Sequence, residues 1–174
     1  MRLPKPETWT ARDGAAVIIR PIRAADLELE KEFVDGLSPS TGYQRLMSTR
    51  KLSIDELKRF TDIDYAREMA LIATIAVEGG ERQVGVARYV KDEYSPREAE
   101  FAIVLADDWQ GRGLGRKLLS SLLAAARQHG VQRVTGTTSS TNQGMLELAR
   151  RLGFGAARHP GGAAERLLTL DLAP

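Results

Sequence analysis

The chain has 174 residues, of which 43% are hydrophobic and 28% are charged, and its formal net charge is +2. This length and balance are typical of a globular domain, and so small a net charge argues against a nucleic-acid partner. The absence of cysteine excludes disulfides, thiolate metal sites and a cysteine nucleophile.

The first segment, residues 1–14, is polar and is interrupted by Pro4 and Pro6, so we expect it to be loosely ordered. It has no apolar run of the kind found in a secretory signal peptide. No later stretch is long and apolar enough to span a membrane. These features favour a cytoplasmic protein without a membrane partner.

Short apolar runs between turn residues predict strands, and apolar residues at helical spacing predict helices. Ser53 and Glu56 have the spacing of a capping box, which marks the start of a helix. On these grounds we expect strands over residues 16–22, 69–77, 84–90 and 99–105, and helices over residues 24–37 and 53–60.

The second half of the chain has a more regular pattern. Apolar residues from Leu114 to Ala126 recur at helical spacing, and Gly130 is a suitable stop for that helix. We expect a strand over residues 131–137, a helix around residues 145–152 and a last strand over residues 167–172. With no internal repeat or linker, the pattern indicates one domain, residues 1–174, of the α/β (α+β) class.

A glycine-rich segment, residues 110–117, joins the strand at 99–105 to the helix that follows it. Glycine allows a tight turn and a close approach of an anion to the backbone. The first N–H groups of a helix lack internal partners and lie at its positive end. Arg112, Arg116 and Lys117 add positive charge, so the segment predicts a phosphate-bearing ligand. The alternative is a tight turn with no ligand.

Two common phosphate motifs do not fit this segment. Arg116 stands where a Walker A loop that begins at Gly111 needs its second glycine. The same residue stands where a dinucleotide fingerprint needs its third glycine. What remains is the pattern Gln-x-x-Gly-x-Gly, at Gln110, Gly113 and Gly115.

This pattern resembles the acetyl-CoA loop of the GNAT (Gcn5-related N-acetyltransferase) superfamily. Asn142, Met145, Leu148 and residues 152–154 are similar to the closing helix of that family and its Gly-Phe ending. A narrower resemblance, to the acetyltransferase domain of bacterial Pat-type protein lysine acetyltransferases, is carried by residues 45–47, 63–65, 67–71, 85–88, 99–102 and 107–110.

The resemblance implies a mixed, mostly antiparallel central sheet flanked by helices, with splayed strands that form the acetyl-CoA cleft. It implies acetyl-CoA as cosubstrate, with its pantetheine arm beside a bulged strand and an N–H near Leu105 directed at the thioester carbonyl. The cofactor-binding residues that it implies are Ile103, Val104, Leu105, Gln110, Gly111, Arg112, Gly113, Leu114, Gly115, Arg116 and Asn142.

The resemblance also implies a base. A lysine amine has a reference pKa near 10.4 and must lose a proton before it attacks. Glu100 occupies a position similar to that of the glutamate base in Gcn5-type lysine acetyltransferases. The alternatives are that Glu100 is a surface strand residue or that it pairs with Arg88. Ala149 stands where many family members have a tyrosine as general acid.

Three functions stay open at this stage. In the first, the acceptor is a protein lysine. In the second, it is a small amine such as a polyamine, amino acid or antibiotic. In the third, the chain is a regulatory module that binds acyl-CoA without turnover. Asp107 and Asp108 favour structural or substrate-facing roles, and neither His129 nor His159 has a partner at ligand spacing, so we expect no metal. The oligomeric state is left open, a homodimer included.

Overall fold

The structure is a computed structural model that describes residues 2–41 and 52–173, in which eight strands form one sheet. The strand order is β1-β2-β3-β4-β5-β6-β8-β7. Among the neighbouring pairs, β5 and β6 run parallel and the others run antiparallel. This arrangement confirms the expected mixed, mostly antiparallel sheet. Residues 45–47, which carry part of the sequence resemblance, lie outside the described residues.

The elements follow the predicted order along the chain. The strands are β1 (Glu7–Thr10), β2 (Ala16–Pro21), β3 (Glu68–Val77), β4 (Gly80–Lys91), β5 (Glu98–Leu105), β6 (Arg133–Ser139), β7 (Gly155–His159) and β8 (Gly162–Asp171). The helices are α1 (Leu27–Asp35), α3 (Ile54–Thr61), α4 (Leu114–Gln128) and α5 (Gln143–Arg151), with short 3-10 turns η1 (Ala24–Asp26) and η2 (Asp107–Trp109).

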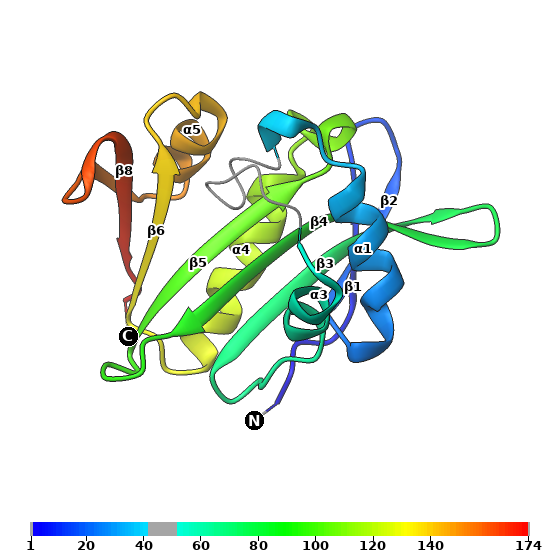
Figure 1. The fold of residues 1–174 in the computed structure, drawn as a ribbon, viewed down its shortest axis with the longest axis horizontal. Helices are drawn as coiled ribbons and strands as arrows, with labels where there is room; N and C mark the ends of the chain where they lie inside the picture. The colour runs from blue at the N-terminus through cyan, green and yellow to red at the C-terminus, as the bar shows by residue number, and fades with distance from the viewer. Residues whose placement is uncertain (1, 42–51, 174) are drawn as a thin grey trace.

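The helices cover the sheet from both sides (Figure 1). Helix α4 packs behind the sheet, where Leu118 and Leu122 are fully buried among side chains of β3, β4 and β5. Helices α1 and α3 lie in front of β3 and β4. Phe33 of α1 packs there against Ile72 and Val104. The sheet therefore separates two apolar layers, and every central strand contributes side chains to both.

Two strands were missed by the sequence prediction. Residues 1–14 are not a loosely ordered segment throughout, because Glu7–Thr10 form β1 and pair with Ala16–Ile19 of β2. The strand is short and mostly exposed, so it has only Trp9 as an inward apolar residue. Strand β7 is an edge strand with exposed residues, and its sequence lacks the apolar alternation by which a strand is recognised.

The splay between β5 and β6 is the feature that positions the site. The two strands pair only where Glu98–Glu100 lie beside Arg133–Thr135. From Phe101 to Leu105, β5 has no strand partner on that side among the described residues. The expected bulge in β5 is not found, because its register with β4 is regular. The register shift lies instead between Ala73 and Thr74 of β3.

Candidate functional site

The glycine-rich loop connects the open end of β5 to α4. Trp109 of η2 is 3% exposed and packs into the core at the base of the loop. Gly111 and Gly113 have φ values of 72° and 87°, and Gly113 is the residue at the N-cap of α4. Only glycine adopts this left-handed conformation readily, which explains why the pattern requires glycine at position 113.

The N–H groups that follow this turn have no acceptors. Gln110 donates to the carbonyl of Asp107 at 3.3 Å, and Lys117 donates to the carbonyl of Gly113 at 3.3 Å. Between them, the N–H groups of residues 111–116 make no hydrogen bond within the described part of the chain. Six such donors at the positive end of a helix form a site suited to an anion.

The cations of the loop differ in their surroundings. The guanidinium of Arg112 lies 3.7 Å from the centre of the Trp109 ring and forms an ion pair with Asp13. Lys117 lies 3.1 Å from a carboxylate oxygen of Glu7. Arg116 is exposed and makes no ion pair with any residue that the structure describes. Positive charge is therefore present on both sides of the unpaired N–H groups.

Gln110 fastens the loop to β5. Its side-chain amide donates to the carbonyl of Leu105 and to the hydroxyl of Thr41, both at 3.3 Å. Thr41 in turn donates to Asp107 at 2.7 Å. Asp108 forms two hydrogen bonds of 2.8 Å with Arg82. Both aspartates therefore have structural contacts.

The open edge of β5 presents backbone groups toward the splay. The N–H of Ala106 donates to the carbonyl of Val84 in β4 at 2.8 Å. Because successive residues of a strand direct their N–H and C=O groups to opposite sides, those of Leu105 and Ile103 face away from β4. These groups therefore lie on the side where β6 has diverged.

Glu100 lies at the point where β5 and β6 part. It is the last residue of β5 that pairs with β6, opposite Thr135. Its side chain is exposed on the face that carries α1 and α3, two residues from Ala102. It makes no hydrogen bond or ion pair with another described residue. The expected alternative, a pair with Arg88, is absent.

Arg88 is engaged elsewhere on the same face. It donates to the carbonyl of Phe60 at 3.2 Å, and its guanidinium lies 4.8 Å from the centre of the Phe60 ring. It also lies 3.9 Å from the buried carboxylate of Glu30 in α1. These contacts join α1 and α3 to β4 and leave Glu100 as a separate carboxylate.

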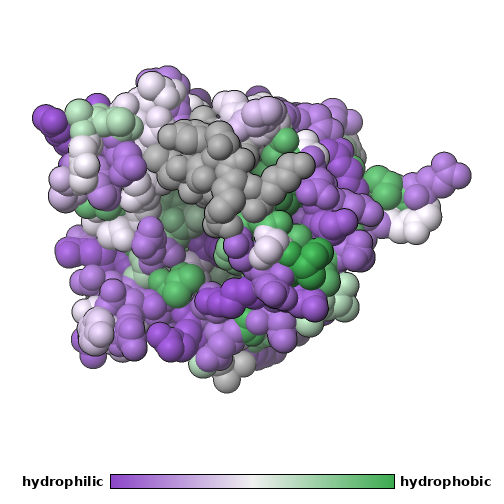
Figure 2. Space-filling model, viewed as in Figure 1, coloured by the Kyte–Doolittle hydropathy of each residue, from purple (hydrophilic) through white to green (hydrophobic). Residues whose placement is uncertain are grey.

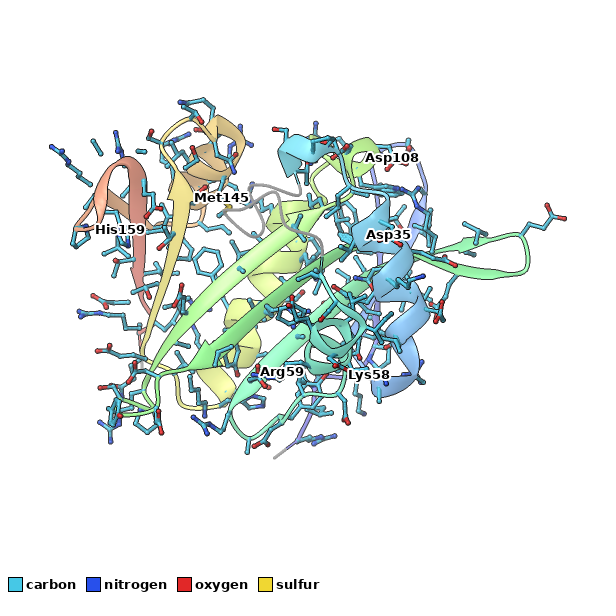
Figure 3. The ribbon with its side chains drawn as sticks, viewed as in Figure 1. Asp35, Lys58, Arg59, Asp108, Met145 and His159 are labelled. Carbon is cyan, nitrogen blue, oxygen red and sulfur yellow. The ribbon has the colours of Figure 1, made fainter. Side chains whose placement is uncertain are left out.

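Helix α5 borders the splay on its other side. Met145 of α5 and Asp108 lie at the same end of the sheet, on either side of the tip of β5 (Figure 3). The side chain of Asn142 caps α5, since its oxygen accepts a hydrogen bond of 3.1 Å from the N–H of Met145. Ala149 is 1% exposed and belongs to the core, and its methyl side chain has no proton to donate.

The sequence prediction missed the residues of the N-terminal strand that contact the loop. In β1, the ring of Trp9 contacts Gly113, and Glu7 forms an ion pair with Lys117. Asp13, in the turn that follows β1, forms an ion pair with Arg112. Asp13 and Arg112 are 99 positions apart in the chain, so no local spacing indicates that they meet. The pairing of β1 with β2 brings them together.

The described residues also form a depression away from the glycine loop. A surface depression of about 660 Å³ lies at the far end of β5 and β6, where it is lined by residues 95–98, Gln132, Arg133 and Asp171. An exposed ion pair between Arg133 and Asp171 borders it. The described residues include no cluster of three or more potential metal ligands and no helix with the length and apolarity of a membrane span.

Comparison with known proteins gives consistent matches. Residues 39–154 match the model of the acetyltransferase (GNAT) family. The chain is 35% identical to the acetyltransferase PA5475 of Pseudomonas aeruginosa, over 92% of this chain and 86% of that protein. It is 31% identical to the acetyltransferase Pat of Mycolicibacterium smegmatis over 82% of this chain, but spans only 42% of Pat. The crystal structure of the GNAT domain of S. lividans PAT has a TM-score of 0.88 and 27% identity, with 98% of this chain and 100% of that one covered.

Proposed function

Because the chain belongs to the acetyltransferase (GNAT) family, we propose that it acetylates lysine side chains of proteins, with Glu100 as general base. Its reaction class is that of an acetyl-CoA-dependent N-acyltransferase. The observation that supports acetyl-CoA as cosubstrate is the row of N–H groups at residues 111–116, without acceptors among the described residues, next to the open edge of β5. The protein lysine acceptor rests on the similarity to Pat.

The loop would hold the diphosphate of acetyl-CoA. Its N–H groups and the helix dipole both favour negative charge, and the left-handed glycines let the phosphates approach the backbone. The pantetheine arm would then follow the unpaired side of β5, along Ile103, Val104 and Leu105. Asn142 retains its side-chain NH₂ for a contact from α5, because only its oxygen is used in capping.

The open edge of β5 would also assist the chemistry. With the arm beside β5, the N–H of Leu105 is available to donate to the thioester carbonyl. A fixed donor of this kind stabilises the oxyanion that develops when an amine adds to the carbonyl carbon. Collapse of the tetrahedral intermediate forms the amide and releases the coenzyme A thiolate. Since residue 149 is an alanine, which has no acidic group, we expect the thiolate to leave without a proton from that position.

Glu100 would receive the proton of the attacking amine. A lysine ammonium costs roughly 4 to 5 kcal/mol to deprotonate at pH 7, given its reference pKa near 10.4. Glu100 makes no contact with a described residue that would occupy its carboxylate, and it stands where the strands begin to separate. The acidic side chain is therefore at the closed end of the splay, and it is exposed, so an amine from solvent could approach it.

The proposal is tested by measuring the release of the coenzyme A thiol from acetyl-CoA. The acceptors are a panel of lysine-bearing proteins and a panel of small amines. We expect turnover with proteins, and a loss of about 10²-fold or more in Glu100→Gln. Glu98→Gln is a matched control, because Glu98 is exposed on the same face of β5 two residues away. Turnover with small amines alone would identify a small-molecule acetyltransferase, and equal turnover of Glu100→Gln and the native chain would remove Glu100 as the base.

A further inference from the structure

The hairpin formed by β1 and β2 is fastened to the glycine loop at several points. A Cβ atom on Gly113 would lie 3.6 Å from the ring of Trp9, so that ring contacts the turn directly. Glu7 accepts hydrogen bonds from Ser121 at 2.6 Å and from Lys117 at 3.1 Å. The first strand therefore braces both the turn and the first half of α4.

Arg112 is held on two sides by this arrangement. One face of its guanidinium stacks on Trp109 at 3.7 Å, and its Nη2 donates to Asp13 Oδ2. Asp13 is itself fixed, because its Oδ1 accepts a hydrogen bond of 3.0 Å from the N–H of Ala15 in the same turn. The Nε and Nη1 donors of Arg112 make no hydrogen bond within the described residues.

The resemblance already implies that Arg112 binds the cofactor; we propose that Asp13, which lies outside the loop, is the residue that positions Arg112 against the diphosphate of acetyl-CoA. This inference rests on the proposed function, which puts the diphosphate on the N–H groups of residues 111–116. A guanidinium is planar and offers donors along more than one edge. Arg112 can therefore keep Asp13 on one edge while its remaining donors bind a phosphate oxygen.

The expected gain in affinity for the diphosphate comes from the prior ordering of the Arg112 side chain rather than from its charge alone. A free arginine side chain loses rotamer freedom when it binds, and that loss weakens the contact. Asp13 and Trp109 already restrict Arg112 before the ligand arrives. The opposing effect is repulsion between the carboxylate of Asp13 and the phosphates, by which Asp13 would lower the affinity for coenzyme A. The two effects therefore predict changes of opposite sign in the affinity for coenzyme A when the charge of Asp13 is removed.

These two effects can be separated by titration calorimetry of the full chain. The ligands are coenzyme A, dephospho-coenzyme A and, in a displacement titration, pantetheine. We expect Arg112→Met to weaken binding of both diphosphate ligands about tenfold. We expect Asp13→Asn to weaken it about threefold. Neither variant should change the affinity for pantetheine, which carries no diphosphate, whereas a merely structural role would affect all three ligands.

Two further variants sharpen the test. Arg112→Lys keeps the charge but lacks the planar fork, so we expect it to bind like Arg112→Met. Asp171→Asn removes an exposed Arg–Asp pair between β6 and β8 and should bind all three ligands like the native chain. Arg112→Lys with native affinity, or Asp13→Asn with native or higher affinity, would overturn the inference.

The proposed function and this inference can fail separately. If the native chain binds coenzyme A no more tightly than pantetheine, the diphosphate is not held by the loop and the proposed function loses its basis. If the native chain prefers coenzyme A and Asp13→Asn and Arg112→Met keep that preference, the loop is correct and only the roles of Arg112 and Asp13 are wrong.

Discussion

Gly136 shows how a single missing side chain shapes the splay between β5 and β6. Phe101 packs across Gly136, and its ring centre lies 5.1 Å from that of Phe154. A Cβ atom at position 136 would lie 2.4 Å from the nearest ring atom of Phe101. A contact this short forces the ring or the strand to move. Gly136 therefore lets an aromatic side chain of β5 lie over β6 next to the point where they diverge.

This contact predicts a loss of stability in Gly136→Ala. We expect the free energy of unfolding to fall by about 2 kcal/mol, the usual scale for overpacking a core. Urea denaturation measures it. Gly144→Ala is the matched control, since Gly144 lies in α5 with its nearest neighbour 3.8 Å from the added carbon. That variant should gain about 0.5 kcal/mol from helix propensity. Equal stability of the two variants would contradict the packing described here.

At single positions, the sequence predicted some features of the site and could not predict others. The sequence pattern predicted Gly113, because a left-handed turn before a helix favours glycine. The contact between Asp13 and Arg112 depends on the pairing of β1 with β2, which carries almost no apolar signal. The capping role of Asn142 was likewise missed, since the resemblance indicated only a cofactor contact.

Among the elements, the junction of β2 with α1 depends on a buried ion pair. Arg20 donates two hydrogen bonds of 2.8 Å to Asp26, whose side chain is 3% exposed. Burial raises the pKa of Asp26, but the hydrogen bonds from Arg20 and from the N–H of Arg23 outweigh it and hold that pKa below its usual range. The ionised carboxylate is therefore the form that the fold stabilises.

The sign of the pH effect follows from this pKa. A carboxyl group whose pKa is lowered in the folded state contributes stability at neutral pH. That contribution is lost as the pH falls below 3.8, the ordinary pKa of an aspartate, and through the lower pKa of the folded state. We expect the melting temperature to fall on acidification below about pH 4. Asp26→Asn should lose on the order of 3 kcal/mol at pH 7 and show a shallower acid transition.

A second aspartate provides the control for that experiment. Asp35 is exposed at the end of α1 (Figure 3), and Asp35→Asn should stay within about 0.5 kcal/mol of the native stability at pH 7. Urea denaturation at pH 7 and thermal melting between pH 7 and pH 3 measure both variants. An unchanged acid transition in Asp26→Asn would show that the ion pair does not couple α1 to β2.

In the molecule as a whole, the sequence predicted the fold well because the buried elements have strong periodic patterns. The core helix α4 and the strands β3, β4 and β5 combine apolar spacing with clear turn residues at their ends. The sheet order depends on long-range pairing and was not predicted, since the resemblance implied only a mixed, mostly antiparallel sheet with splayed strands. The face of the molecule seen in Figure 2 is largely hydrophilic. The edge strand β7 is exposed and has no apolar alternation, so its sequence does not predict a strand.

The arrangement of the site follows from the same long-range pairing. Glu100 and the open edge belong to the same strand, β5, and the glycine loop connects the end of that strand to the start of α4. Sequence spacing identified each part singly. Only the pairing of β5 with β4 on one side and its separation from β6 on the other brings them into one site.

Amide chemical shifts of the ¹⁵N-labelled chain during titration with coenzyme A test the central claim most directly. We predict that the amides of residues 111–116 shift and saturate with coenzyme A and with dephospho-coenzyme A, and that pantetheine leaves them unchanged, because a diphosphate accepts their hydrogen bonds. Binding of coenzyme A that leaves these six amides unperturbed would contradict the claim.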